Sequence, residues 1–265
     1  MAISLIKLMR YIIIKIFMPI FILAFAAYLA RWLHIFRAVI FPYPHEIIAA
    51  GIKSLTTPLA MSALGITLRR LLVVFTVSSG IGVVMAFLFH QFRLLEEIFS
   101  LPVDVVRSIP VVTLFPLFIT LWGFTEVTFL AVPVVLTSVI MYIHLSAGLK
   151  DVAEMRYSLM LRWEASRSQI ILHLLLPSIA PHLFTGLRIC VSLQLILLLV
   201  AEMFLGAKNG LGTLIYDYQT ILDYDKMYFF ILLSGILGWV INVVIEYLQK
   251  RIVYWQAYQA INGKE

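Results

Sequence analysis

Glycines, a lysine and a threonine gather at residues 206 to 213, Gly-Ala-Lys-Asn-Gly-Leu-Gly-Thr, and these residue types could bind phosphate. A nucleotide-binding P-loop needs two glycines with four residues between them, followed at once by lysine and then by serine or threonine. Here the lysine precedes the second glycine, so the composition is present without the spacing. We therefore expect this stretch to form a turn-rich outer loop and not a nucleotide site.

The sequence also lacks the residue patterns that are typical of metal-binding sites and of covalent catalysis. The six histidines never fall at paired metal-ligand spacings with carboxylates or cysteine. There is no Gly-x-Ser-x-Gly elbow and no Cys/His arrangement that would suggest a nucleophile. The single cysteine, Cys190, lies in an apolar stretch and is best explained as a small packing residue. The sequence thus predicts no catalytic, cofactor-binding or metal-binding residues, and we expect the chain not to be an enzyme.

Three positions inside apolar runs, Arg107, Pro110 and Glu202, are candidates for translocation or gating. A carboxylate in a membrane span is a functional-site hypothesis by default, which applies to Glu202. Glu202 could instead reach water near the outer end of its span or pair with Lys208, so a structural or gating role and direct substrate contact both stay open. The motif Arg107-Ser-Ile-Pro110 is better explained as a bend and an inner-face anchor than as a binding site.

The composition indicates what must position these residues. The 265 residues are 62% hydrophobic and only 13% charged, whereas about a quarter of an ordinary soluble domain is charged. Lipid is therefore the expected solvent. The net charge of +6 does not indicate nucleic acid, because basic residues scattered among apolar runs are typical of a membrane protein whose positive charge collects on one side.

Six apolar runs approach the roughly 20 residues that cross a bilayer. They are 11–33, 71–89, 105–122, 127–149, 187–205 and 227–245. A signal peptide within residues 1–30 is the rival explanation of the first run, but the apolar residues continue too far for it. The third run contains Pro110 and Pro116, so we expect a kinked span. The sequence thus predicts an all-α integral membrane protein with six transmembrane helices.

Two polar segments stand out between these runs. The longest, Lys150 to Ser168, contains seven charged residues and no glycine, and it is expected to be helical, exposed to water and ended by Leu176-Pro177. The other begins with Pro42-Tyr-Pro44 and continues from His45 to Leu55 as a short amphipathic surface helix, with proline in its first turn.

The distribution of lysine and arginine predicts the orientation. With six crossings and a cytoplasmic N-terminus, seven basic residues lie outside and the other thirteen of the twenty lie inside or at the inner boundary. The outer residues are Arg31, Arg37, Lys53, Arg69, Arg70, Lys208 and Lys226. Both termini and the segment from Lys150 to Ser168 are therefore expected in the cytoplasm.

Several short motifs follow one another in order and together cover about Pro42 to Trp255. They are Pro42-Tyr-Pro44, Thr67-Leu-Arg-Arg70, Arg107-Ser-Ile-Pro110, Gly148-Leu-Lys-Asp-Val152, Ala165-Ser-Arg-Ser-Gln-Ile-Ile-Leu-His-Leu-Leu-Leu-Pro177, Pro181, Thr185-Gly-Leu-Arg188, Ala201-Glu202 and Gly210-Leu-Gly212. Each motif is weak alone, but the set resembles the permeases of binding-protein-dependent ABC importers, and most closely the nitrate, sulfonate, taurine and bicarbonate branch.

The resemblance implies a type I permease fold and a division of the chain into three parts. Residues 1–41 would be an N-terminal transmembrane helix and linker, and residues 256–265 a cytoplasmic tail. Residues 42–255 would be a core of five transmembrane helices, with a cytoplasmic coupling helix near 153–176.

The resemblance also implies the function and the partners. The chain would be the inner-membrane permease subunit of an ATP-driven importer for a small solute, an organic or inorganic anion on the branch resemblance. Two such permease subunits form the pathway, two ATP-binding cassette ATPases bind below, and an extracytoplasmic binding protein delivers the solute. The chain itself would bind no cofactor, since ATP and magnesium bind to the ATPases.

The coupling segment carries the residues that the resemblance assigns to ATPase contact, and it also departs from the family pattern. The assigned residues are Ser158, Glu164, Ala165, Ser166, Arg167, Gln169, His173 and Pro177. The family begins this segment with Glu-Ala-Ala and places glycine six residues after the glutamate, whereas this chain has Ser158-Leu-Met160 and Glu164. The sharp turn that glycine permits must then be made differently. Because a two-fold dimer repeats every substitution, we expect this chain to pair with a second, different permease, although a symmetric dimer with an altered ATPase groove stays open.

Two other classes of membrane protein are the alternatives. A secondary transporter or channel subunit that is not driven by ATP should show matching interrupted helices in two repeats or a charged pore lining, and no internal repeat is visible. A membrane-embedded enzyme would need a convergent polar cluster at one depth, which Glu202 and His144 alone do not supply. The sequence does not identify the transported solute.

Overall fold

A computed structural model describes residues 22, 25, 28, 29, 32, 33, 40–152 and 154–255. All regular elements in this part of the chain are helices. They are α3 (Pro44–Leu55), α4 (Pro58–Gln91), α5 (Arg93–Ser108), η2 (Val111–Leu114), α6 (Phe115–Trp122), α7 (Glu126–Lys150), α8 (Glu154–Arg162), α9 (Arg167–Ile170), η3 (Ile171–Leu175), α10 (Leu176–Phe204), α11 (Leu211–Thr220) and α12 (Tyr224–Ile252).

Four helical stretches in this part of the chain are long and apolar enough to cross a membrane, and a fifth is possible if the bent pair formed by α5 with η2 and α6 is one span. The four are Pro58–Gln91, Glu126–Lys150, Arg167–Phe204 and Tyr224–Ile252. The all-α membrane class is thus confirmed. The predicted first span, 11–33, lies outside the described residues apart from isolated positions, as does the predicted tail, 256–265.

The chain divides into two compact units, Met1–Met61 with Leu214–Leu233, and Ser62–Thr213 with Ser234–Glu265. In the first unit α3 packs against the N-terminal part of α12, where a Cβ on Gly51 would overlap the ring of Phe229. The Ser54 and Tyr218 hydroxyls also share a hydrogen bond of 3.1 Å. The backbone N–H of Tyr43 donates to Glu46 at 2.7 Å, and Pro44 occupies the first turn. The predicted short amphipathic helix is therefore confirmed as α3.

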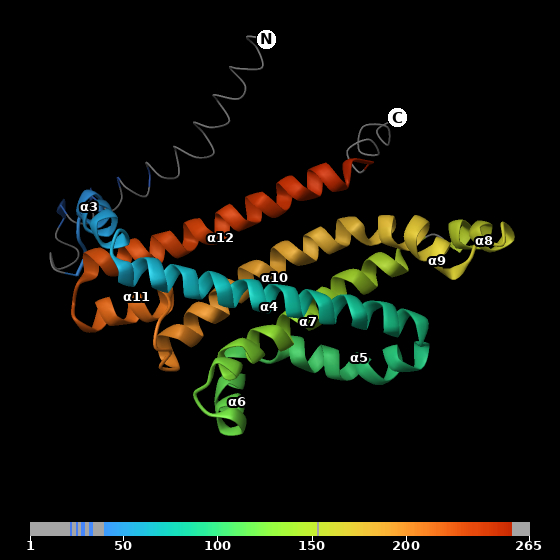
Figure 1. Ribbon diagram of the computed structural model, residues 1–265, viewed down its shortest axis with the longest axis horizontal. Coiled ribbons are helices and arrows are strands. Elements are labelled where there is room, and N and C mark those ends of the chain that lie inside the picture. The colour runs from blue at the N-terminus through green and yellow to red at the C-terminus, as the bar shows by residue number, and fades with distance from the viewer. Residues whose placement is uncertain are drawn as a thin grey trace, which may run out of the picture. The chain divides into compact units, whose positions relative to one another are not determined.

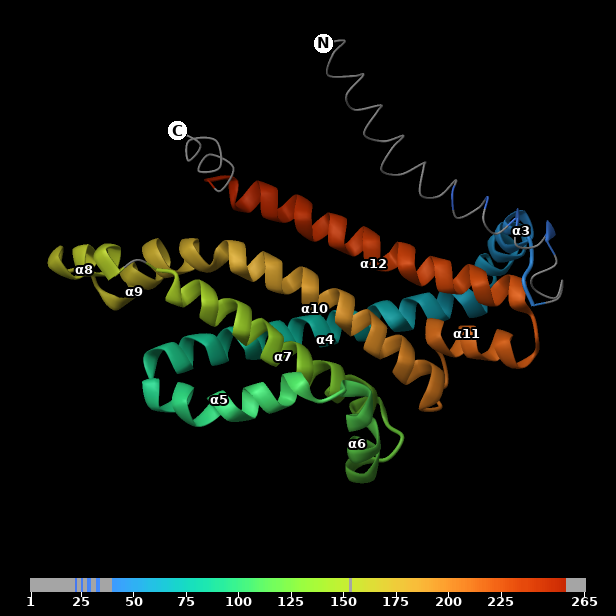
Figure 2. The ribbon, with the colours of Figure 1, turned by 180° about the vertical axis from the view of Figure 1, so that it is seen from behind.

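In the second unit α7 and α10 pack closely along each other, and α5 lies beside α7 (Figures 1 and 2). The amide of Gln194 on α10 joins three helices, because Nε2 donates to Ser78 on α4 at 2.8 Å and to Thr137 on α7 at 2.9 Å. Gly82 brings α4 against α7, where a Cβ would meet Met141 at 2.5 Å. Small residues and buried hydrogen bonds thus hold together helices that the hydrophobic effect alone would not orient.

The third predicted span is bent more sharply than a kink. Its helix begins at Arg93 rather than near Val105, and the axes of the two halves differ by 103°. Proline disfavours the α region for the preceding residue, and Ile109, which precedes Pro110, is extended at φ −73°, ψ 131°. Because Pro110 also lacks an N–H, α5 ends at Ser108 and the chain restarts in a new direction as η2 and α6 (Figure 1).

Candidate functional site

The predicted coupling segment consists of two helices and not one. Helix α8 ends at Arg162, and α9 begins at Arg167 after a break. Ser158 on α8 is exposed. The absence of glycine had suggested a continuous helix, so that interpretation is wrong at residues 163–166. Of the eight residues assigned to this surface, six are exposed, and only Ala165 and Pro177 are partly buried.

The break is made by Glu164, which takes the left-handed conformation at φ 53°. The Ala165 N–H donates to the Met160 carbonyl at 3.1 Å and the Glu164 N–H to the Leu161 carbonyl at 3.0 Å. These two bonds form the Schellman motif, in which the residue beyond the helix end is usually glycine. Glu164 thus makes the turn at the position where the family resemblance places glycine. Because Glu164 has a Cβ, its left-handed backbone conformation is strained, whereas glycine would adopt it without strain.

Ser166 and Gln169 start the next helix. The Gln169 N–H donates to Ser166 Oγ at 3.3 Å, and the Ser166 N–H donates to Gln169 Oε1 at 2.8 Å. This reciprocal pair is a capping box, which satisfies two N–H groups that a helix start leaves free. Both residues therefore have a local structural role within the coupling segment, and Arg167 follows as the first residue of α9.

Leu176-Pro177 does not end the helix, contrary to the sequence-based expectation. The helical stretch runs without a break from Arg167 to Phe204. Proline within a helix removes one hydrogen bond and crowds the carbonyl four residues earlier, which here belongs to His173. The π-helical turn η3, which immediately precedes Leu176, widens the helix at this point. Exposed His173 also makes a 3.1 Å contact from Nδ1 to the Gln169 carbonyl oxygen.

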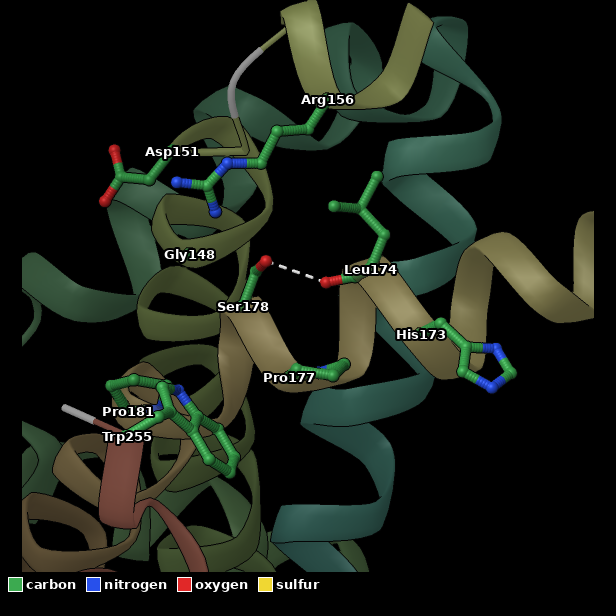
Figure 3. Close-up of a pocket in the computed structure, with 9 residues that line it drawn as sticks. All are labelled: Gly148, Asp151, Arg156, His173, Leu174, Pro177, Ser178, Pro181 and Trp255. Carbon is green, nitrogen blue, oxygen red and sulfur yellow. Dashed lines mark hydrogen bonds between the residues drawn. The ribbon is translucent and has the colours of Figure 1, made fainter. Parts of the chain in front are cut away.

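A pocket of about 450 Å³ lies between α7, the beginning of α8 and the beginning of α10 (Figure 3). Its lining residues are Gly148, Asp151, Arg156, His173, Leu174, Pro177, Ser178, Pro181 and Trp255. The Ser178 hydroxyl donates to the Leu174 carbonyl at 2.7 Å, so the inner wall is fixed by the helix itself. Gly148 allows α7 to approach α10, because a Cβ there would meet the His182 ring at 2.8 Å.

Sequence reasoning missed the apolar side chains that this segment exposes. Trp163 is 78% exposed at the end of α8, and Met155 at its beginning is similarly exposed. The charged residues around Trp163 dominate the sequence pattern, which therefore predicts only a polar, water-exposed segment here. Trp163 lies directly before the left-handed turn at Glu164, so the exposed apolar side chains lie beside the break between α8 and α9.

Glu202 lies in a second, fully buried polar cluster. Its side chain is 1% exposed, and its carboxylate accepts from Arg70 Nη1 at 2.8 Å and from the Gly212 N–H at 2.9 Å. Thr67 Oγ1 lies 2.9 Å from both carboxylate oxygens and accepts from the Leu211 N–H at 2.9 Å. The cluster therefore connects α4, α10 and the start of α11 within the second unit.

Arg70 supplies the charge that Glu202 needs. The guanidinium is 6% exposed and reaches Glu126 through Nη2 at 2.8 Å and the Asn209 carbonyl through Nη1 at 2.8 Å. The alternatives that Glu202 reaches water or pairs with Lys208 are therefore wrong. Because every carboxylate oxygen is occupied and buried, this structure offers no surface of Glu202 to a solute.

Glycines surround the Glu202 carboxylate closely. A Cβ on Gly210, whose φ is 152°, would overlap the carboxylate, and a Cβ on Gly212 would overlap the Leu199 carbonyl. The loop that composition had suggested for phosphate thus binds a carboxylate of its own chain. It closes over α10 and continues into α11 at Leu211.

Arg107 lies in the last turn of α5 and Pro110 in the bend that follows. Arg107 Nε pairs with Asp104 Oδ1 at 3.0 Å. The structure therefore does not bring Arg107 and Pro110 together with Glu202 in one cluster.

The family model for the binding-protein-dependent transport system inner membrane component matches residues 78–254. This range includes the coupling segment, the bend at Pro110 and Glu202.

Curated relatives are similar over most of the chain. The formylaminopyrimidine transport permease protein ThiX of Halalkalibacterium halodurans is 30% identical over 82% of this chain and 86% of that protein. The putative aliphatic sulfonates transport permease protein SsuC of Bacillus subtilis is 22% identical over 84% and 81%. The nitrate import permease protein NrtB of Leptolyngbya laminosa is 26% identical over 78% and 68%.

Solved structures share the fold. A chain of the crystal structure of an amino acid ABC transporter with histidines matches at a TM-score of 0.60 and 15% identity, over 78% of this chain and 97% of that one. A chain of the MetNI methionine ABC transporter in an inward-facing conformation matches at 0.56 and 21% identity, over 75% and 98%.

The buried pair of Arg70 and Glu202 should show strong energetic coupling. Glu202→Ala leaves Arg70 with a buried, half-paired charge, so we expect a loss of about 3–5 kcal/mol of unfolding free energy. The double variant Arg70→Met with Glu202→Ala should lose less than the sum of the two single changes Arg70→Met and Glu202→Ala, because it removes both charges. Thermal unfolding of the purified permease measures the loss of unfolding free energy in each variant. Glu97→Ala, which breaks an exposed pair with Arg93, is the control and should change little; additive losses would contradict the coupling.

Replacing Glu164 by glycine should relieve the strained turn. A left-handed residue with a side chain costs about 1–2 kcal/mol relative to the unstrained state, so Glu164→Gly should stabilise the end of α8. Trypsin cleavage at Arg162 and Arg167, which flank the turn, would report local opening and should slow in this variant. Glu164→Ala removes the carboxylate but keeps the Cβ, and it should give no such protection. Equal cleavage rates in both variants would show that the turn is not strained.

Proposed function

The chain belongs to the family of binding-protein-dependent transport system inner membrane components, and on that basis we propose how this permease meets its partners and its solute. It is the membrane permease subunit of an ABC importer and has the type I permease fold. It is a transport subunit and not an enzyme, and nucleotide binding in such systems belongs to partner ATPases. The finer assignments below are our proposals.

The ATPase-coupling surface is the exposed segment of α8, the turn at Glu164 and α9. The observation that carries this proposal is the exposure of Trp163 beside that turn, in a segment otherwise rich in charge. Ser158 and Arg167 lie exposed on the same segment, and His173 lies exposed on the turn η3 that follows it. Because Arg167–Phe204 is one continuous helical stretch, a displacement of α9 would move the membrane-spanning part of α10 with it. That continuity supports transmission of ATPase movement to the pathway.

The partners are two ATPase subunits, an extracytoplasmic binding protein and a second permease subunit. We keep the proposal that this second permease is a different chain. Its support is the altered coupling turn: Glu164 replaces the expected glycine at a strained position, and a symmetric dimer would repeat that strain at both ATPases.

The protein is a multi-pass protein of the inner membrane, consistent with its family and its apolar helices. We propose that both termini and the α8–α9 segment lie in the cytoplasm, because thirteen of the twenty basic residues fall on that side when seven are placed outside.

The solute is proposed to be a small organic or inorganic anion. The support comes from relatives named for aliphatic sulfonates, nitrate and taurine. Arg107 and Pro110 at the bend of α5 are proposed to line or gate the pathway. For Glu202 we propose a structural role, since burial and four occupied contacts hold it in place.

Native mass spectrometry of the complex purified through a tag on this chain, with its whole gene cluster expressed, tests the proposal. We expect one copy of this chain, one different permease of similar size and two ATPase subunits.

The variant Trp163→Ala should lose most of the bound ATPase, because truncating a central aromatic residue of an interface costs about 2 kcal/mol or more of binding free energy.

The matched control is Trp122→Ala, an exposed tryptophan at the end of α6, which should keep the ATPase bound. Full ATPase retention by Trp163→Ala would reject the proposed coupling surface. Two copies of this chain without another permease in an active complex would reject the mixed pair.

A further inference from the structure

Polar side chains follow one face of α5. Glu96, Ser100, Asp104 and Arg107 are spaced i, i+4, i+8 and i+11, which places them on the same side of a helix. Together with Tyr142, Ser146 and Lys150 of α7 they line a pocket of about 290 Å³.

The other faces of α5 have apolar environments. Leu94, Ile98, Leu101 and Val105, spaced i, i+4, i+7 and i+11, are large apolar side chains that are exposed, as expected for a face toward lipid. Val103 is buried in the cluster that contains Tyr142. The polar face is therefore neither the packed face nor the face suited to lipid.

The charges on this polar face are exposed on α5, the first half of the bent helix pair that is long and apolar enough for a span only together with η2 and α6. Asp104 and Arg107 pair at 3.0 Å while their side chains remain 59% and 55% exposed. Lys150 and Glu96 pair at 2.5 Å at the other end of the pocket. Tyr142 lies eight residues before the end of α7, about 12 Å along the helix at 1.5 Å per residue, so the pocket extends well into the span. Charged groups at such depth almost always face water or a polar partner.

We propose that this polar face of α5, with the facing part of α7, is a low-affinity binding site for the oxyanion group of the transported solute, with Arg107 as the specificity-determining residue. This inference rests on the proposed import of a small anion. The planar guanidinium offers several N–H donors in a fork that matches an oxyanion. The hydroxyl of Tyr142 lines the same pocket and can donate a further hydrogen bond, whereas the Ser100 hydroxyl already donates to the Glu97 carbonyl at 2.8 Å.

Asp104 keeps this site weak. Two cations and two carboxylates line the pocket, so its formal charge is zero when all four are ionised. A transport pathway must bind a solute well enough to admit it and weakly enough to release it. The solute would compete with Asp104 for Arg107, which lowers affinity without removing the preference for an anion.

Cysteine labelling in membrane vesicles that contain the assembled importer tests the site. Ser100→Cys and Leu101→Cys, each in a Cys190→Ser background, place a thiol at adjacent exposed positions on the polar and the apolar face. A charged methanethiosulfonate reagent should modify Ser100→Cys about tenfold faster, because the reactive thiolate forms in water. Methanesulfonate should slow this labelling, whereas its uncharged analogue dimethyl sulfone should not. Adding Arg107→Gln should abolish the protection.

Three results would overturn the inference. They are equal labelling on both faces, fast labelling that methanesulfonate leaves unchanged, and labelling of Ser100→Cys only in the isolated permease, which would show that the second permease covers this face. ATPase co-purification with the same cysteine variants separates the two levels of the account. If the ATPase is retained while labelling or protection fails, the proposed anion site is wrong and the proposed ATPase coupling stands; if the ATPase does not bind, the proposed ATPase coupling is wrong.

Discussion

The buried ion pair between Arg70 and Glu202 is the interaction on which the second unit depends. A carboxylate with 1% exposure in an apolar helix would be very unfavourable unless charge and hydrogen bonds surrounded it. Arg70, Thr67 and the Gly212 N–H supply them. Because these groups come from α4, α10 and the start of α11, satisfying one carboxylate fixes the mutual arrangement of these three segments. The glycines at 210 and 212 follow from the same requirement, since a Cβ at either position would overlap this cluster.

The same constraint separates the functional surfaces from the scaffold. Lipid solvates no polar group, so each polar group must be paired within the bundle or face water or another protein. In the Glu202 cluster the polar groups are paired with one another within the bundle, and this cluster is the fixed part of the permease. The α8–α9 segment and the polar face of α5 leave polar groups exposed. In our proposals the α8–α9 segment contacts the ATPase and the polar face of α5 binds the solute, while the buried cluster keeps the helices in register.

Composition and run length predicted the membrane class, the amphipathic helix α3 and most of the spans, because a bilayer imposes length and apolarity on every crossing. The sequence could not predict the partner of Glu202, since Arg70 is 132 residues away and Lys208 is close in sequence. It also missed the break at Glu164, because glycine is the usual signal for a left-handed turn and glutamate is not. Pro177 misled for a different reason: a π-helical turn accommodates a proline that would ordinarily end a helix.

Hydrogen–deuterium exchange of the permease in lipid nanodiscs tests the central interaction most directly. The Leu211 and Gly212 N–H groups follow a glycine-rich loop, where exchange would ordinarily be fast, yet they donate to Thr67 and Glu202 in the buried cluster. The account predicts exchange at these two amides as slow as in the core of α10 and far slower than at Trp163 and Glu164. Fast exchange at Leu211 and Gly212 in the wild-type protein would contradict it, because the Glu202 cluster would then not hold the loop.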